Sequence, residues 1–467
     1  MNRKVFIAVA MLLLGATARV SPPVAAQKSA VTFSETIAPI VYAHCVTCHR
    51  PGEAAPFSLI TYEDVRRRGK LLVTVTQQRL MPPWQAAHGY GDFEGERRLA
   101  DDQIAAIAAW VDAGMPQGDP ARMPPLPAFP DGWHLGTPDL VLRMTEPFDV
   151  PASGPDVFRN FVIPSGLTED KWVRAVEFRP SARAVVHHAL FAYVPGGSLR
   201  AANGADGRPG FRGLAPIGLT GRGGGGSGPL GGWAVGGTPR FLPDGQALPM
   251  ARNADVVLQM HFHPTGKAER EQSTIGIYFA KSPPERRMSN LQLPGLFGVG
   301  AGIDIPAGER AYAIESSATM PTDVKLFAVN PHAHYLGKEM KATATLPDGT
   351  TRPLLWIQDW DFNWQDGYNY KEPVVLPKGT RIDVTIVYDN SDVNPRNPST
   401  PPRRVQWGEQ STDEMGTIGF LLQPVRREDE PAWQAFAAQW LRQTVLSAVR
   451  NGTVERLRES RALQGVQ

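Results

Sequence analysis

The pattern of hydrophobic and polar positions changes once along the chain, from a helical period to an alternating one. Near the amino terminus, residues 33–43, 62–78 and 101–113 have apolar side chains at helical spacing. Thr61 stands where it would cap the second of these helices, and Gly114 follows the third and ends it. These segments predict a small all-α domain over residues 30–118.

Beyond this domain the pattern is typical of β-structure. A Pro-rich linker is expected over residues 119–142, and residues 256–263 and 381–387 then read as strands. Many short strands with turn signals predict two all-β, jelly-roll-like sandwiches. The chain is therefore expected to be a multidomain protein, with sandwiches at 143–290 and 291–427 and a C-terminal helix within 428–467.

Composition and the first residues of the chain indicate where the protein is located. The formal net charge of +2 gives no indication of a nucleic-acid partner. Arg3 and Lys4 precede an apolar run over residues 5–16, and Val24-Ala25-Ala26 resembles a signal cleavage site. Twelve apolar residues fall short of the roughly 20 that span a bilayer. We therefore expect a signal peptide at residues 1–26, no transmembrane span, and a periplasmic or secreted protein.

The chain has two cysteines, and both lie in one motif. Cys45-Val46-Thr47-Cys48-His49 fits C-x-x-C-H, the pattern of covalent c-type heme attachment, with His49 as the proximal iron ligand. The alternative, a thioredoxin-like redox pair, would require a βαβ pattern that this region lacks. If both thiols hold heme c, the protein contains neither a disulfide nor a copper–thiolate site.

The sixth heme ligand is expected to be Met81, which opens a rigid Met-Pro-Pro-Trp loop. Met115 and His88 are the competing ligands, and a five-coordinate heme with Met81 as a packing residue is the remaining alternative. The C-V-T-C-H, M-P-P-W and W-V-D-A-G stretches resemble the small heme-c domains that bacteria fuse to other periplasmic modules.

Six of the ten histidines form three close pairs in the β-rich region. These pairs are His187-His188, His261-x-His263 and His332-x-His334. On a strand, residues i and i+2 share one face, whereas the adjacent pair would need a bulge or twist to bind one ion. Copper, zinc and non-heme iron all accept imidazole, and no carboxylate stands beside the pairs. The soft thioether of Met415 and the neighbouring heme favour copper.

These segments resemble the copper type II, ascorbate-dependent monooxygenases, the family of the peptidylglycine and dopamine β-hydroxylating enzymes. The matching stretches, in order, are V-H-H-A-L-F at 186–191, G-W-A at 232–234, L-P-D-G at 242–245, V-L-Q-M-H at 257–261, H-A-H-Y-L-G-K at 332–338 and D-E-M at 413–415.

The resemblance implies two copper ions in separate sites. His187, His188 and His261 would hold the copper that receives electrons, and His332, His334 and Met415 the copper that binds O₂ and performs catalysis. His263 is left without a role. The implied reaction hydroxylates a C–H bond of a small-molecule or peptide substrate, with electrons from an ascorbate-like reductant or a redox protein through the heme.

The sequence also departs from this family. The peptide-hydroxylating member has an Arg and a Tyr that bind the substrate carboxylate, and Asn330 and Gly419 occupy these positions here. A C-terminal glycine substrate is therefore not expected. Two alternatives are a heme/copper protein that transfers electrons or binds copper without oxygenation, and a zinc hydrolase built on the first three histidines. The hydrolase would explain neither Met415 nor the heme motif.

Overall fold

The computed structural model describes residues 31–53, 55–129, 132–212, 227–235, 237–243 and 245–457. The expected signal peptide and Asp244 of the L-P-D-G stretch lie outside these described residues. Within them, no helix has both the length and the apolar character required to cross a bilayer.

The amino-terminal region is helical, as the periodicity predicts. Its helices surround a core that includes Phe33, Leu59 and Trp110. That this region is a cytochrome c domain stays a prediction. The helical elements are η1 (Phe33–Ile37), α1 (Ala38–His44), α2 (Tyr62–Arg67), α3 (Gly69–Gln77) and α4 (Asp101–Asp112).

The prediction of a single helix over residues 62–78 is wrong, because the helix is interrupted at Arg68. Thr61 caps α2 with a reciprocal capping box to Asp64, as predicted. Arg68 then leaves the helical region, with φ −107° and ψ 4°, and α3 begins at Gly69. A Cβ at Gly69 would stand 2.6 Å from the Met115 sulfur. A side chain at this position would therefore have to displace Met115 where α3 packs on the end of α4.

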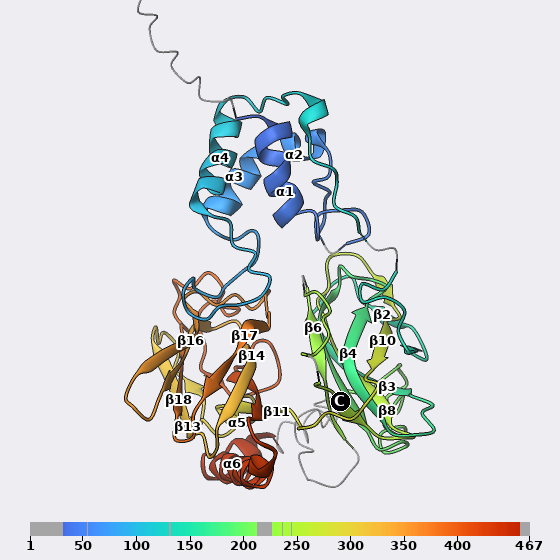
Figure 1. Cartoon of the computed structure of the whole chain (residues 1–467), viewed down its shortest axis with the longest axis vertical. Helices are drawn as coiled ribbons and strands as arrows, with labels where there is room; N and C mark the ends of the chain where they lie inside the picture. Colours follow the sequence, from blue (N-terminus) through green and yellow to red (C-terminus); the bar gives the residue numbers. More distant parts are fainter. Residues whose placement is uncertain are drawn as a thin grey trace, which may run out of the picture.

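The first β-region is a sandwich of two four-stranded antiparallel sheets, ordered β1-β10-β4-β7 and β3-β8-β5-β6 (Figure 1). Alternating apolar residues of both sheets form one core, which includes Phe148, Phe191 and Phe262. The strands are β1 (Leu140–Arg143), β2 (Phe148–Val150), β3 (Val157–Pro164), β4 (Lys171–Arg179), β5 (Val186–Val194), β6 (Gly228–Ala234), β7 (Leu248–Met250), β8 (Asp255–Phe262), β9 (Glu269–Glu271) and β10 (Thr274–Phe279).

The second β-region repeats this architecture, with sheets ordered β11-β20-β14-β17 and β13-β18-β15-β16. The two sandwiches expected from the alternating pattern are thus confirmed. The elements are β11 (Ser289–Leu293), α5 (Gly295–Gly298), β12 (Asp304–Ile305), β13 (Tyr312–Thr319), β14 (Val324–Ala333), β15 (Gly337–Thr345), β16 (Thr351–Ile357), β17 (Tyr368–Leu376), β18 (Arg381–Tyr388), β19 (Val405–Gln406) and β20 (Gly416–Pro424).

A long helix closes the described chain, as expected. α6 (Glu430–Arg450) buries Trp433 and Ala448 against the second core. It lies at the end of the molecule opposite the helical region (Figure 1).

One segment of the helical region joins the second sandwich. Residues 84–98, called the docking segment below, follow α3 and run onto β16 and β17 (Figure 1). Ala86 bridges to Ile357 and Phe93 to Tyr370, as in a short added strand. Trp84, Ala86 and Phe93 pack into the core of the second sandwich. The helical region is therefore fixed to the β-structure by buried apolar contacts.

Candidate metal centres

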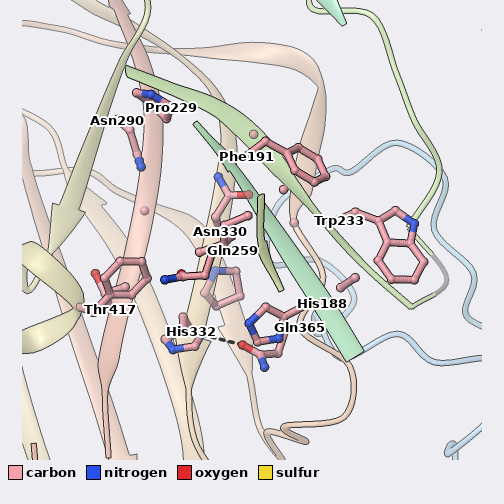
Figure 2. Close-up of a pocket in the computed structure, with 18 of the residues that line it drawn as sticks. His188, Phe191, Pro229, Trp233, Gln259, Asn290, Asn330, His332, Gln365 and Thr417 are labelled. Carbon is pink, nitrogen blue, oxygen red and sulfur yellow. Dashed lines mark hydrogen bonds between the residues drawn. The ribbon is translucent and has the colours of Figure 1, made fainter. Parts of the chain in front are cut away.

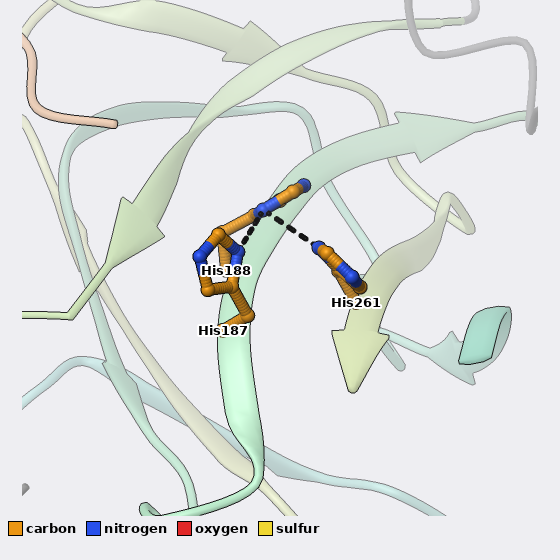
Figure 3. A group of neighbouring side chains, drawn as sticks. All are labelled: His187, His188 and His261. Atoms are coloured by element: carbon orange, nitrogen blue, oxygen red, sulfur yellow. Dashed lines mark hydrogen bonds between the residues drawn. The ribbon is translucent and has the colours of Figure 1, made fainter. Parts of the chain in front are cut away.

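Three of the predicted histidines converge in the first sandwich. His187 and His188 lie on β5 and His261 on the adjacent β8 (Figure 3). The β5–β8 register shifts between Val186 and His188, so His187 lies at a bulge. A bulge re-aims side chains that would otherwise alternate between faces. The distortion that the adjacent pair was expected to need is therefore present.

The Nδ1 atoms of the three rings face one another. His188 Nδ1 lies 3.1 Å from His187 Nδ1 and 3.3 Å from His261 Nδ1. Two nitrogens bound to one ion at ~2.0–2.1 Å with tetrahedral angles are separated by about 3.3 Å. The triad therefore has the spacing of a three-histidine metal site, and these residues form a group able to hold an ion.

The carboxylate of Asp156 supports this triad, and nothing in the sequence near the histidine pairs predicted this contact. Asp156 lies 105 residues before His261, and its Oδ2 accepts a hydrogen bond from His261 Nε2 at 2.8 Å. Its Oδ1 accepts one from His263 Nδ1, also at 2.8 Å. Asp156 lies on the edge of the His261 ring away from the triad, so it orients the ring rather than completing a two-histidine, one-carboxylate site. His263 therefore contacts Asp156 and not the three-histidine group.

The second pair lies at the end of β14, and hydrogen bonds fix both rings. His332 Nδ1 donates to Gln365 Oε1 at 2.5 Å (Figure 2). His334 Nδ1 donates to the Asp413 carbonyl at 3.1 Å. Both bonds leave the Nε2 lone pairs available to an ion. The β14–β20 register pairs Ala333 with Gly416. Met415, the residue before Gly416, therefore reaches the end of β14 where His334 lies.

Glu414 anchors this second group, although its role was not predicted. Its carboxyl group is fully buried and accepts from the backbone N–H groups of His334, Leu336 and Met415 at 3.0, 2.7 and 3.1 Å. Burial raises the pKa of Glu414 to about 8. The D-E-M stretch contained this residue, but nothing local indicated that its side chain folds back onto the histidine strand.

Burial also keeps the clustered imidazoles neutral. It lowers the pKa of His187 to about 3 and that of His332 to about 4. The pKa values of His188, His261 and His334 are lowered as well, first of all by burial. A neutral imidazole has the lone pair that a metal requires, so these five histidines are ready to bind at neutral pH.

Both groups face one cavity of about 1080 Å³ between the sandwiches, lined by His188, His332, His334 and Met415. Phe362 contacts both groups, with ring centroids 5.0 Å from His187 and 5.7 Å from His334. These two distances limit the separation of the His187 and His334 rings to 10.7 Å. The two groups are therefore near neighbours that share contact with one phenyl ring.

The positions that differ from the peptide-hydroxylating enzymes also meet in this cavity. Asn330 on β14 pairs with Gly419 on β20, and both line the wall beside His332 (Figure 2). Arg97, which also lines the cavity, forms an ion pair with Asp366. The cavity wall includes several carboxamides, among them Gln365 and Gln259, and the ring of Phe297 lies 5.3 Å from that of His332.

The predicted heme-binding residues lie together at the end of α1. Cys45 ends the helix, and both cysteine thiols are free. His49 Nδ1 donates to the Phe57 carbonyl at 3.1 Å, which leaves Nε2 available to a metal. Burial raises the pKa of Cys45 to about 12. A redox-active pair needs an accessible thiolate, so this burial disfavours the thioredoxin-like alternative.

The three candidates for the sixth heme ligand have different environments. Met81 is partly exposed and borders a small cavity beside Thr76 and Leu99. The sulfur of Met115 is packed against Gly69, and its carbonyl accepts a hydrogen bond from Tyr62. His88 is 76% exposed and lies 3.5 Å from Glu96. That Met81 is the sixth ligand stays a prediction.

The fold and these contacts define a two-sandwich protein with a three-histidine group and a histidine–methionine group on one cavity. The chain is similar to DBH-like monooxygenase protein 1 of Gallus gallus, with 22% identity over 204 residues. The match covers 41% of this chain and 32% of the relative, so it spans about a third of that protein. No family model matches.

Solved structures add no argument about function. The capsid protein P2 of bacteriophage PM2 matches 62% of this chain and 98% of its own, at 9% identity and a TM-score of 0.24. PNGF-II matches 61% of this chain and 65% of its own, at 10% identity and a TM-score of 0.24. Scores this low do not establish a shared fold.

Proposed function

We propose that this protein is a copper-dependent monooxygenase that hydroxylates a substrate C–H bond with O₂, using electrons delivered through a covalent c-type heme. The observation that carries the proposal is the pair of metal-binding groups on one cavity. His187, His188 and His261 form one group, and His332, His334 and Met415 form the other. The similarity to a DBH-like monooxygenase supports the same reaction class.

The side chains fit copper at both groups. Five neutral imidazoles and one thioether form a donor set without a thiolate, and the soft thioether favours Cu(I). When bound, copper would supply one-electron redox chemistry and O₂ activation. Replacing a substrate hydrogen by hydroxyl consumes O₂, two electrons and two protons, and it releases one water. A single heme carries one electron at a time, so it has to deliver twice in each turnover.

The chain's own residues have three tasks in this reaction. Asp156, Gln365 and the Asp413 carbonyl orient the imidazoles. Glu414 holds the two segments that carry His334 and Met415 together by accepting from the backbone N–H group of each. The wall beside His332 receives the substrate, and Asn330 and Gly419 provide no cation for a carboxylate at these two positions. The proposed substrate is therefore a small molecule or a peptide other than one with a C-terminal glycine.

The heme assignment rests on Cys45, Cys48 and His49, with Met81 as the sixth ligand. Free cysteines, a His49 ring oriented by Phe57 and a core of apolar side chains support heme attachment. Such attachment takes place outside the cytoplasm, which agrees with the proposed export to the periplasm or beyond. The external donor to the heme would be an ascorbate-like reductant or a redox protein.

The test combines metal analysis with oxygen uptake. We expect two coppers and one heme per chain, and O₂ consumption that depends on reductant. Met415→Ala should retain the three-histidine copper and lose at least 90%, roughly 1.4 kcal/mol in barrier, of the O₂ consumption. Leu126→Ala, at an exposed linker residue, is the matched control.

Zero or one copper per chain, or unchanged O₂ uptake in Met415→Ala, would contradict the proposal. Two coppers without O₂ uptake in the wild-type protein would instead identify a non-oxygenating electron-transfer protein.

A further inference from the structure

Asp156 joins three side chains from two sandwiches. It lies just before β3 and accepts hydrogen bonds from His261 and His263 of the first sandwich. Ser411 of the second sandwich, 255 residues away, donates to the same Oδ2 at 2.9 Å. The Asp156 side chain is 14% exposed and Ser411 is 5% exposed. A nearly buried carboxylate therefore connects the two halves of the cavity.

The contact with His261 determines which nitrogen of that ring faces the triad. An ionised carboxylate only accepts hydrogen bonds, so the His261 proton lies on Nε2 and the lone pair on Nδ1. Nδ1 is the atom that lies 3.3 Å from His188 Nδ1. The negative charge behind the ring also makes this imidazole a stronger donor and favours the more positive state of a bound ion.

The contact with Ser411 continues to the second group. Ser411 belongs to the loop before β20, and the Asp413 carbonyl in this loop accepts the His334 Nδ1 proton at 3.1 Å. The same loop leads directly into Met415. One short route therefore runs from His261 through Asp156 and Ser411 to the residues that hold His334.

We propose that Asp156 is a positioning residue that aims His261 at the first metal group and holds the second group in register with it. This inference rests on the proposed copper function. It assigns to one carboxylate both the orientation of a ligand and the spacing of the two sites.

Asp156→Asn tests the first role, because it removes the charge and keeps the shape. Copper affinity at the three-histidine group should fall by about 10- to 100-fold. Its Cu(II) EPR spectrum should change, and its reduction potential should rise. Asp149→Asn is the matched control, since Asp149 is 84% exposed on β2 of the same sandwich.

Ser411→Ala tests the second role without touching His261. It should leave the affinity of the first copper unchanged and alter the Cu(II)–Cu(II) dipolar coupling, which continuous-wave EPR measures at separations this short. Asp156→Asn should alter this coupling as well. If Asp156→Asn does not fold, Ser411→Ala and Ser411→Val carry the test.

The outcomes separate this inference from the proposed function. A wild-type protein that binds no copper overturns both. Two coppers in the wild type, with Asp156→Asn matching Asp149→Asn in affinity and spectrum, overturns the ligand-orienting role alone. A Cu(II)–Cu(II) dipolar coupling in Ser411→Ala equal to that of the wild type overturns the spacing role.

Discussion

Glu414 is the most constrained polar side chain beside the proposed catalytic group. Its carboxyl group accepts from three backbone N–H groups, those of His334, Leu336 and Met415. Tyr388 supports the same place, because its hydroxyl donates to the Met415 carbonyl at 3.0 Å. Either oxygen of a carboxyl group can accept, but an amide NH₂ cannot, so an amide in its place leaves at least one of these N–H groups unpaired.

Glu414→Gln should therefore destabilise the metal-free protein by about 1–3 kcal/mol, because the amide NH₂ would face backbone N–H groups. Copper should also be lost from the histidine–methionine group before it is lost from the three-histidine group. Thermal unfolding of the metal-free protein and copper titration measure the two effects. Glu315→Gln, at an exposed position on β13, is the control, and equal stability of the two variants would contradict the prediction.

At the scale of elements, β3 holds a loop that borders the cavity. Arg159 on β3 is 1% exposed and donates to both oxygens of Asp206 at 2.9 Å. It also donates to the carbonyls of Pro209 and Gly210, and Asn160 bridges to Phe211. The loop is thus attached to the strand through one buried guanidinium.

Asp206→Asn should weaken this attachment by about 1–3 kcal/mol at neutral pH, less than for a fully buried pair, because Asp206 is partly exposed. The hydrogen bond from Arg159 lowers the pKa of Asp206 to about 2 from an ordinary value of 3.8. The folded carboxyl thus binds its proton more weakly than the unfolded one. Its stabilisation is complete above pH ~4 and is lost as the pH falls through 2.

Denaturant unfolding of the wild type and Asp206→Asn between pH 2 and 7 would measure this difference, with Asp149→Asn as the control. The difference in unfolding free energy should shrink from about pH 4 downward. A difference independent of pH would show that the charge of Asp206 is not its source.

The sequence predicted the secondary-structure elements and the candidate metal ligands, but not the residues that hydrogen-bond and orient those ligands. The strand pattern over residues 256–263 predicted the strand that carries His261, and adjacency predicted the distortion at His187. Asp156 and Gln365 reach the histidines from loops 105 and 33 residues away, so no local period records them.

At the scale of the whole molecule, the helical region contacts both sandwiches. Glu53, close to the heme motif, pairs with Arg183, which lies four residues before His187. Gln85 of the docking segment bonds the backbone of Asp361 and Trp364. The loop that Gln85 holds carries Gln365 and Phe362, which contacts both histidine groups. The helical region and the two histidine groups therefore share structural supports.

Phe93→Ala should destabilise the second sandwich by about 3–5 kcal/mol, although Phe93 precedes both β-regions in the sequence. Its ring is 4% exposed and lies 5.2 and 4.9 Å from the rings of Tyr368 and Tyr370. Leu126→Ala is the control. Calorimetry of the full chain measures the effect, and an unchanged unfolding temperature for the second sandwich would contradict it.

The docking segment has a consequence for how such a protein can change over evolutionary time. Tandem modules on free tethers are interchangeable, since one can be swapped for a homologue without the other adjusting. Here Trp84 packs edge-on against Tyr368, with ring centroids 5.1 Å apart. A substitution on either side is therefore tolerated only with a matching one on the other. The helical region and the second sandwich are expected to be inherited as one unit, and grafting either onto a foreign partner requires transferring residues 84–98 with it.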